Sequence, residues 1–272
     1  MKYIKLKGAT IPALGFGTYE LDDKLANTIV KVALDTGYRH IDTAQMYGNE
    51  TGVGKAIKES GIAREEVFLT TKVLPANLDK KHFLPSVEES LRKLDTDYVD
   101  LLLIHWPNAE VPVDEYIGEL VKAQEKGYAK YIGVSNHTTA LLEKVLATGA
   151  DIITNQVEYH PFLNQDKLYK YLRQHNLTMT AYSPIAQGKV MGNETLKSIG
   201  DKYGKNEVQV ALRWLIQQDG VLAIPRTSKE SHVASNFNIF DFELTQEEMQ
   251  KISKLTQENT RLVSPSFAPD WD

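Results

Sequence analysis

The chain has 272 residues and a net charge of −5, so it lacks the basic excess typical of nucleic-acid-binding proteins. It has no cysteine, which excludes disulfides, thiol catalysis and thiolate metal sites. No apolar run approaches the roughly 18 residues of a membrane span, and the first residues lack a signal-peptide core. We therefore expect a cytoplasmic protein with no membrane partner.

Short apolar runs alternate with helical patterns along almost the whole chain. Residues 3–6 and 10–12 flank Lys7-Gly8 and predict a β-hairpin. Eight later runs are typical of strands: residues 13–18, 40–42, 67–72, 99–104, 131–135, 152–157, 178–182 and 221–224. The helical segments between them end at glycines, which are common after a last helical turn.

Strands that alternate with helices predict right-handed crossovers and a parallel sheet. Eight repeats in about 225 residues favour a closed (β/α)8 TIM barrel over an open doubly wound sheet. We expect the N-terminal hairpin to cap the bottom of this barrel and residues 261–272 to form a short extended tail. Residues 1–272 would then be a single domain.

Four ionisable residues stand at or just past the ends of predicted strands: Asp42, Tyr47, Lys72 and His105. In a parallel barrel these ends share one face, where barrel active sites lie. A lysine ammonium beside a phenol stabilises the phenolate and would lower its pKa, and a carboxylate would keep that lysine charged. Each residue alone could be an ordinary polar residue, but together they predict a proton-donating site.

A second candidate site follows the last predicted strand. The segment 223–232 runs into a helix start and carries Arg226, Thr227, Ser228 and Lys229. Free N–H groups at a helix start favour anions, so a phosphate site is plausible here. A solvated, capped helix start is the alternative.

Further polar or aromatic residues also end predicted strands. Tyr182 could stack on a flat ring, or could simply be a core tyrosine. Ser135, Asn136 and Gln156 could bind an amide, or only cap loops. His40 and Asp42 form a His-x-Asp pair, but the further histidines of a metal-dependent hydrolase barrel are missing, so no metal is expected.

Across its whole length the chain resembles the aldo-keto reductase family. The motifs that carry the resemblance occur in order: Ile41-Asp42-Thr43-Ala44 with Tyr47-Gly48-Asn49-Glu50, Thr71-Lys72, Leu103-Ile104-His105-Trp106-Pro107, Gly133-Val134-Ser135-Asn136, Asn155-Gln156-Val157-Glu158-Tyr159-His160-Pro161 and Ile224-Pro225-Arg226-Thr227. The ending 261–272 further resembles bacterial members that reduce 2,5-diketo-D-gluconate and methylglyoxal.

The resemblance implies an NADPH-dependent reductase of small aldehydes, α-dicarbonyls or keto sugars, with NADH as a weaker alternative. Tyr47 would be the general acid, Lys72 and Asp42 its tuning pair, and His105 the residue that orients the substrate carbonyl. Cofactor contacts are implied for Gly17, Thr18, Tyr19, Ser135, Asn136, Gln156, Tyr182, Ser183, Ile185, Ile224, Pro225, Arg226, Thr227, Ser228, His232 and Asn236. Among these, Tyr182 would stack on the nicotinamide ring, and Arg226 and Thr227 would hold the 2′-phosphate.

The sequence departs from the family pattern at three positions. Arg226 stands where lysine is usual and adds a bidentate fork. His232 falls where many members carry an arginine, which weakens the expected preference for NADPH. Leu74 replaces a pocket tryptophan, which suggests an open substrate pocket formed by Tyr19, Tyr47, Leu74, His105 and Trp106.

Two other functions stay open at this point. Potassium-channel β subunits share the fold, so the chain could be a redox-sensing regulatory subunit with negligible turnover. A metal-dependent hydrolase barrel is the other. We expect a small-molecule carbonyl substrate and a monomer.

Overall fold

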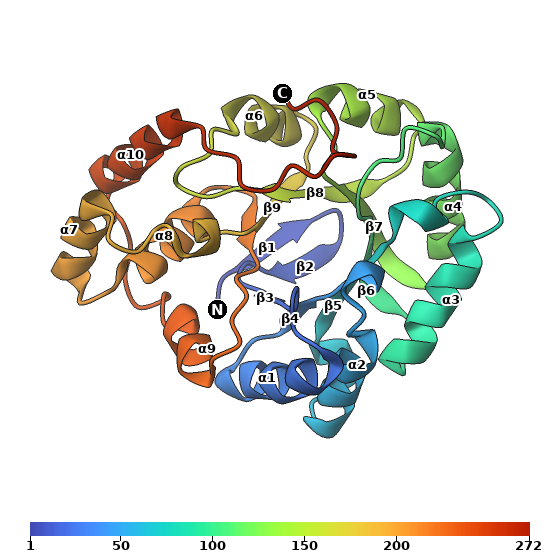
Figure 1. Ribbon diagram of the computed structural model, residues 1–272, viewed down its shortest axis with the longest axis horizontal. Coiled ribbons are helices and arrows are strands. Elements are labelled where there is room, and N and C mark those ends of the chain that lie inside the picture. Colours follow the sequence, from blue (N-terminus) through green and yellow to red (C-terminus); the bar gives the residue numbers. More distant parts are fainter.

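The computed structural model describes residues 1–272 and places eight parallel strands in one sheet, in the order β10-β9-β8-β7-β6-β5-β4-β3. The strands are β3 (Phe16–Gly17), β4 (His40–Asp42), β5 (Phe68–Val73), β6 (Val99–Ile104), β7 (Ala129–Ser135), β8 (Ile152–Glu158), β9 (Thr178–Tyr182) and β10 (Val221–Ala223). Figure 1 shows them at the centre of the molecule, with helices around them.

The sheet closes on itself between its two ends. Ala223 N donates to Ala13 O at 2.9 Å, Gly15 N donates to Ala223 O at 2.9 Å, and Gly17 N donates to Pro225 O at 3.0 Å. A Cβ at Gly17 would lie 2.9 Å from Ile224 O, so glycine permits this close approach. The predicted (β/α)8 barrel is confirmed.

The first predicted strand was too long. Only two of the residues 13–18 are in a regular strand, and Leu14 makes a single bridge to Ala223. The partner strand β10 has three residues and is soon followed by Pro225, which has no N–H to donate. The bond that a residue with an N–H could donate at this position is therefore missing, and only the bond from Gly17 N to Pro225 O follows the bridge.

The helices between the strands form the outer layer: α1 (Asp23–Thr36), α2 (Glu50–Glu59), α3 (Phe83–Leu94), α4 (Val113–Glu125), α5 (Thr139–Ala147), α6 (Asp166–Gln174), α7 (Glu194–Tyr203), α8 (Glu207–Gln217) and, after β10, α9 (Glu230–Phe237) and α10 (Gln246–Leu255). The first helix is typical in its ends: the Asp22 side chain accepts from Leu25 N, and Gly37 follows with φ 116°. No helix is long and apolar enough to cross a membrane.

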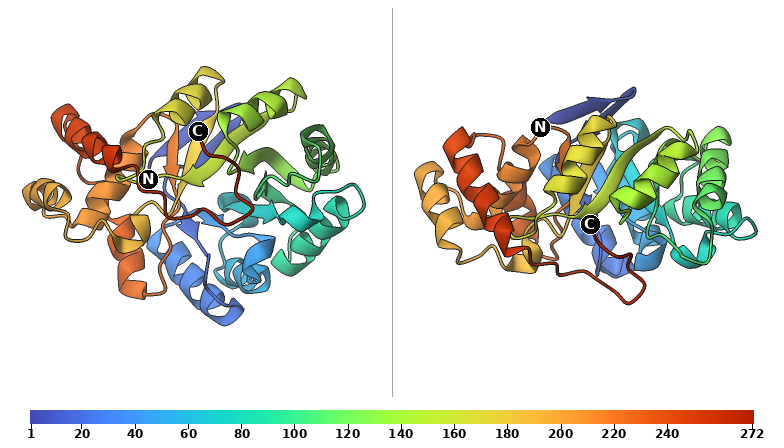
Figure 2. Two further views of the ribbon diagram at one scale, coloured as in Figure 1. Left: turned by 45° about the horizontal axis from the view of Figure 1, so that its top comes forward. Right: turned by 90° about the horizontal axis from the view of Figure 1, so that it is seen from above.

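The predicted N-terminal hairpin is present as β1 (Tyr3–Leu6) and β2 (Ala9–Pro12). Its apolar residues Leu6 and Ile11 form a small core with Phe68, Leu101 and other barrel residues. The right panel of Figure 2 shows the hairpin at one end of the barrel and the C-terminal tail at the other.

The tail, residues 261–272, has no helix or strand and crosses the C-terminal face of the barrel as an extended strap (Figure 1). At its start, Leu262 N and Val263 N each donate to the buried Glu158 carboxylate at 2.8 Å. At its other end, the Asp272 carboxylate accepts from Thr139 N at 2.8 Å and from Lys167 Nζ at 3.1 Å. The strap is therefore held at both ends.

Candidate active site

The four ionisable residues predicted to converge lie together at the C-terminal ends of neighbouring strands. Lys72 Nζ donates to Asp42 Oδ1 at 2.5 Å, to Thr43 O at 2.8 Å and to Tyr47 Oη at 3.3 Å. Parallel pairing of β4 with β5 brings the carboxylate beside the ammonium. Tyr47 ends a short 3-10 helix, Gln45–Tyr47, that turns its hydroxyl back toward β5.

Lys72 and Asp42 are buried, with side chains 0% and 1% exposed. Burial lowers the pKa of Lys72, and the Asp42 carboxylate opposes that change. Burial raises the pKa of the Tyr47 hydroxyl well above its usual value, with further upward contributions from Asp42 and Tyr19. The expected lowering of the pKa of Tyr47 is therefore wrong, because loss of solvent outweighs the nearby ammonium.

His105 stands across from Tyr47, with ring centroids 5.5 Å apart in an edge-on arrangement. Burial and the Lys72 ammonium hold the pKa of His105 well below its usual value, so its ring is neutral at neutral pH. Its Nδ1 atom is buried without a hydrogen-bond partner. A neutral imidazole has one N–H to donate, which suits it to hold a carbonyl oxygen.

The predicted amide-binding residues form a network around these four. Gln156 Nε2 donates to Asp42 Oδ2 at 2.8 Å, so this side chain orients the carboxylate. Tyr182 Oη donates to Asn136 Oδ1 at 2.9 Å, and Asn136 Nδ2 donates to His105 O at 3.0 Å. Ser135 Oγ donates to Gln156 O at 2.7 Å.

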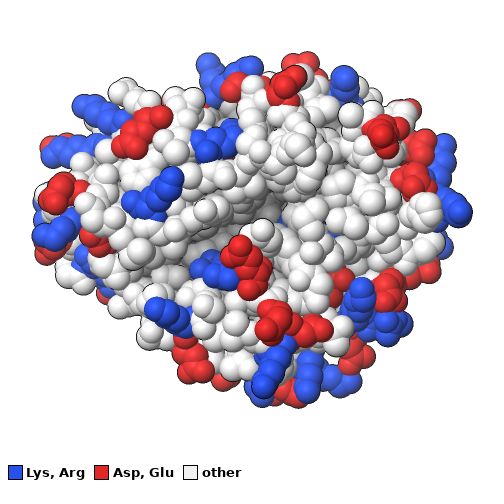
Figure 3. Space-filling model, viewed as in Figure 1, with Lys and Arg blue, Asp and Glu red and all other residues white.

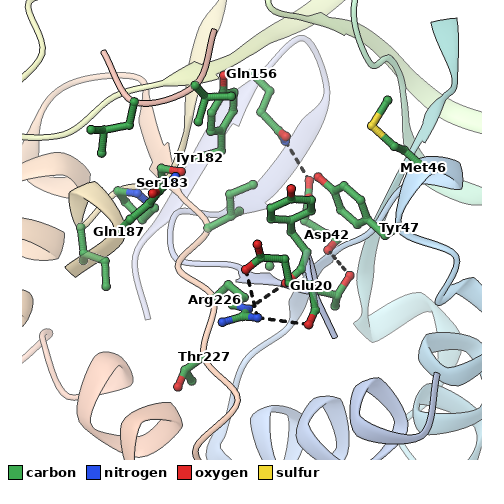
Figure 4. Close-up of a pocket in the computed structure, with 18 of the residues that line it drawn as sticks. Glu20, Asp42, Met46, Tyr47, Gln156, Tyr182, Ser183, Gln187, Arg226 and Thr227 are labelled. Carbon is green, nitrogen blue, oxygen red and sulfur yellow. Dashed lines mark hydrogen bonds and ion pairs between the residues drawn. The ribbon is translucent and has the colours of Figure 1, made fainter. Parts of the chain in front are cut away.

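One cavity of about 890 Å³ joins these residues to the predicted anion site. Its lining includes Gly17, Thr18, Tyr19, Asp42, Tyr47, His105, Trp106, Asn136, Gln156, Tyr182, Ser183, Ile185, Ile224, Arg226, Thr227, Ser228 and His232. Figure 3 shows the cavity as a cleft across the face, and Figure 4 shows Tyr47 and Thr227 on opposite sides of it.

Several predicted residues do not line this cavity. Ser135, Pro225, Asn236 and Lys72 are not part of its lining, and neither is Leu74, which was expected in the substrate pocket. Leu74 follows the end of β5, where its N–H donates to Gln45 Oε1 at 2.8 Å as the chain turns away.

Other residues that line the cavity were not predicted individually from the sequence. These are Glu20, Met46, Pro184, Gln187 and Gly188, and the strap residues Leu262, Val263, Ser264, Pro265 and Phe267, whereas Lys229 of the predicted anion site is in the lining as expected. The Phe267 and Trp271 rings lie 5.5 and 6.0 Å from that of Trp106, so the strap completes an aromatic wall. A polar residue at a strand end signals a barrel site, but nothing in the sequence signals which tail residue folds back over it.

No group of three or more His, Cys, Asp or Glu side chains is placed to hold a metal ion. The His40 ring of the His-x-Asp pair is engaged below the site, with Nδ1 3.2 Å from Pro12 O and Nε2 3.3 Å from Thr70 Oγ1. Asp42 is held by Lys72 and Gln156. The pair therefore does not converge on a common point.

The barrel and its buried Asp-Lys-Tyr-His arrangement define a class of oxidoreductase, and comparison with known proteins gives the family. The model of the aldo/keto reductase family matches residues 13–257, and the chain belongs to this family. It is 44% identical over 267 residues to methylglyoxal reductase DkgB of Escherichia coli O157:H7, which covers 96% of this chain and 99% of that protein. It is 42% identical over 254 residues to glyoxal reductase of Bacillus subtilis (strain 168), covering 92% of this chain and 91% of that one.

A solved structure gives the same result. A crystal structure described as a candidate 2,5-diketo-D-gluconic acid reductase B superposes with a TM-score of 0.98 at 47% identity. The match covers 100% of this chain and 98% of the other.

Proposed function

We propose that the protein is an NADPH-dependent reductase of small aldehydes and α-dicarbonyls such as methylglyoxal, and of keto sugars such as 2,5-diketo-D-gluconate. The observation that carries the proposal is the Tyr47 hydroxyl, 3.3 Å from a buried lysine that is paired with Asp42. The names of the relatives, two dicarbonyl reductases and a diketogluconate reductase, support the substrate class.

The residues present fit a nicotinamide dinucleotide phosphate. The far end of the cavity carries Arg226, Thr227, Ser228 and Lys229 beside the start of α9, and these donors suit a phosphate. Tyr182 and Asn136, whose side chains are bonded to each other, would hold the nicotinamide end near Tyr47. NADPH bound there would supply the hydride that reduces the carbonyl carbon.

The protein's own residues manage the proton and the charge. The neutral His105 ring would donate a hydrogen bond to the carbonyl oxygen and hold it against the Tyr47 hydroxyl. Tyr47 would then give its proton to that oxygen, and Lys72 would stabilise the phenolate that forms. The aromatic wall of Trp106 and Phe267 would exclude water from the reacting atoms.

The test compares wild type with Tyr47→Phe in the oxidation of NADPH and NADH by methylglyoxal. We expect kcat/KM with NADPH to fall by about 10²- to 10⁴-fold in the variant, because the proton donor is lost. The Kd for NADPH should change less than about twofold, since this hydroxyl contacts only Lys72. Tyr131→Phe is the matched control, because its hydroxyl donates to Gly8 O at the hairpin end.

Three other outcomes would contradict parts of the proposed function. Full activity in Tyr47→Phe would mean that another group supplies the proton. Tight NADPH binding with no turnover on any small aldehyde or dicarbonyl would favour the regulatory-subunit alternative. A higher kcat/KM with NADH than with NADPH would contradict the assigned cofactor.

A further inference from the structure

Arg226 is fixed in place by a loop more than 200 residues away in the chain. Its Nε donates to Tyr19 O at 2.8 Å, and its Nη2 donates to Glu20 O at 3.1 Å. The same Nη2 lies 3.2 Å from the Glu20 carboxylate oxygen Oε2. No hydrogen bond engages Nη1, so one edge of the guanidinium is free to receive a ligand.

Glu20 is held against Arg226 by its backbone. Its φ is 59°, in the left-handed region that disfavours residues with a Cβ. In this conformation the Glu20 carbonyl accepts a hydrogen bond from Arg226, and the Glu20 residue lines the cavity. Figure 4 shows the Glu20 and Arg226 side chains beside each other at the cavity wall.

We propose that Glu20 is a built-in competitor for the anion that Arg226 receives, and so sets how strongly the protein prefers NADPH over NADH. The inference rests on the proposed function. The 2′-phosphate of NADPH would bind at the free Nη1, and to engage Nη2 as well it would have to displace the Glu20 carboxylate or share that nitrogen with it. NADH carries a neutral 2′-hydroxyl and would leave the pair intact.

Other charged groups at the anion-binding end of the cavity also act on a bound phosphate, and solvent weakens the attraction between Glu20 and Arg226. Lys229 lines the same cavity and would attract the phosphate, and the His232 ring also lies in that lining. The Glu20 and Arg226 side chains are 62% and 34% exposed, so water and salt weaken their attraction. The competition is therefore modest: it shifts a preference and does not block binding.

The test is Glu20→Gln, which keeps the backbone carbonyl that orients Arg226 but removes the charge. Binding of NADPH and NADH is measured by calorimetric titration at about 50 mM and about 500 mM salt. We expect the Kd for NADPH to fall about three- to fivefold at low salt, the Kd for NADH to change less than about twofold, and the difference to shrink at high salt. Glu110→Gln, an exposed carboxylate outside this cavity, is the control.

A second variant separates charge competition from a change in shape. In an Arg226→Gln background, Glu20→Gln should lose most of its effect on NADPH. An unchanged NADPH Kd in Glu20→Gln, or equal tightening of both dinucleotides, overturns the inference while the proposed function stands. Wild type that binds neither dinucleotide overturns the proposed function and this inference with it.

Discussion

The ion pair between Asp42 and Lys72 lies at the centre of the site and is buried. Unit charges about 3 Å apart attract by about 5 kcal/mol at an effective dielectric constant of 20. Removal of each ion from water costs several kcal/mol, so the pair as a whole contributes little net stability. Loss of one partner is different, because it leaves the other charge buried and unpaired.

We therefore expect Lys72→Met and Asp42→Asn each to lower the free energy of unfolding by about 3–5 kcal/mol. In the double variant, the decrease in the free energy of unfolding should be at least about 2 kcal/mol smaller than the sum of the two single decreases, because neither charge is then left buried without a partner. Asparagine also keeps an oxygen for the bond from Gln156. Urea unfolding followed by circular dichroism at pH 7 measures all three losses.

Lys58→Met is the control for this cycle. Lys58 pairs with Asp95 on the surface, where both side chains are more than half exposed, so its loss should leave the free energy of unfolding nearly unchanged. Strictly additive losses in Asp42→Asn and Lys72→Met would refute the reasoning. They would mean that the two charges do not depend on each other in the folded protein.

Two further predictions concern buried groups outside the proton-donating site. Burial lowers the pKa of His137 to about 4, below the unfolded value of about 6.5, so the unfolded chain takes up the proton first. Protonation of His137 in the unfolded chain should therefore lower the free energy of unfolding by up to about 3 kcal/mol as the pH drops from 6.5 to 4. In unfolding curves of His137→Gln, the free energy of unfolding should fall less over the same pH range. Glu158→Gln removes an acceptor from the N–H groups of Leu262 and Val263 and should cost about 1–3 kcal/mol. Limited proteolysis should then cut the strap faster than in wild type, and an unchanged cleavage rate would contradict its assigned anchor.

The sequence predicted the barrel because its signals are local. Apolar runs, helical spacing and terminal glycines each report on a few neighbouring residues. A parallel barrel then brings all strand ends to one face, so Asp42, Lys72 and His105 could be placed without coordinates. The closure of the barrel was less predictable, since it rests on a single bridge between Leu14 and Ala223 and on glycines that allow close contact.

Contacts between distant loops could not be predicted in this way. The bonds from Arg226 to Tyr19 and Glu20 join residues 207 and 206 positions apart, and no local pattern marks them. The absence of Leu74 from the cavity lining has a similar cause. The side chain of a residue at the end of a strand points wherever the following turn directs it, and here Gln45 fixes that turn.

The wrong sign for the pKa of Tyr47 is instructive, because a sequence shows neighbours but not solvent. Proximity to Lys72 argued for a lower pKa, yet burial of the hydroxyl raises it. A raised pKa keeps the phenol protonated at neutral pH, as a proton donor must be before the reaction. In the reaction that we propose, Lys72 therefore acts when the proton leaves: the ammonium then faces a phenolate in a site with little water, where its attraction is strongest.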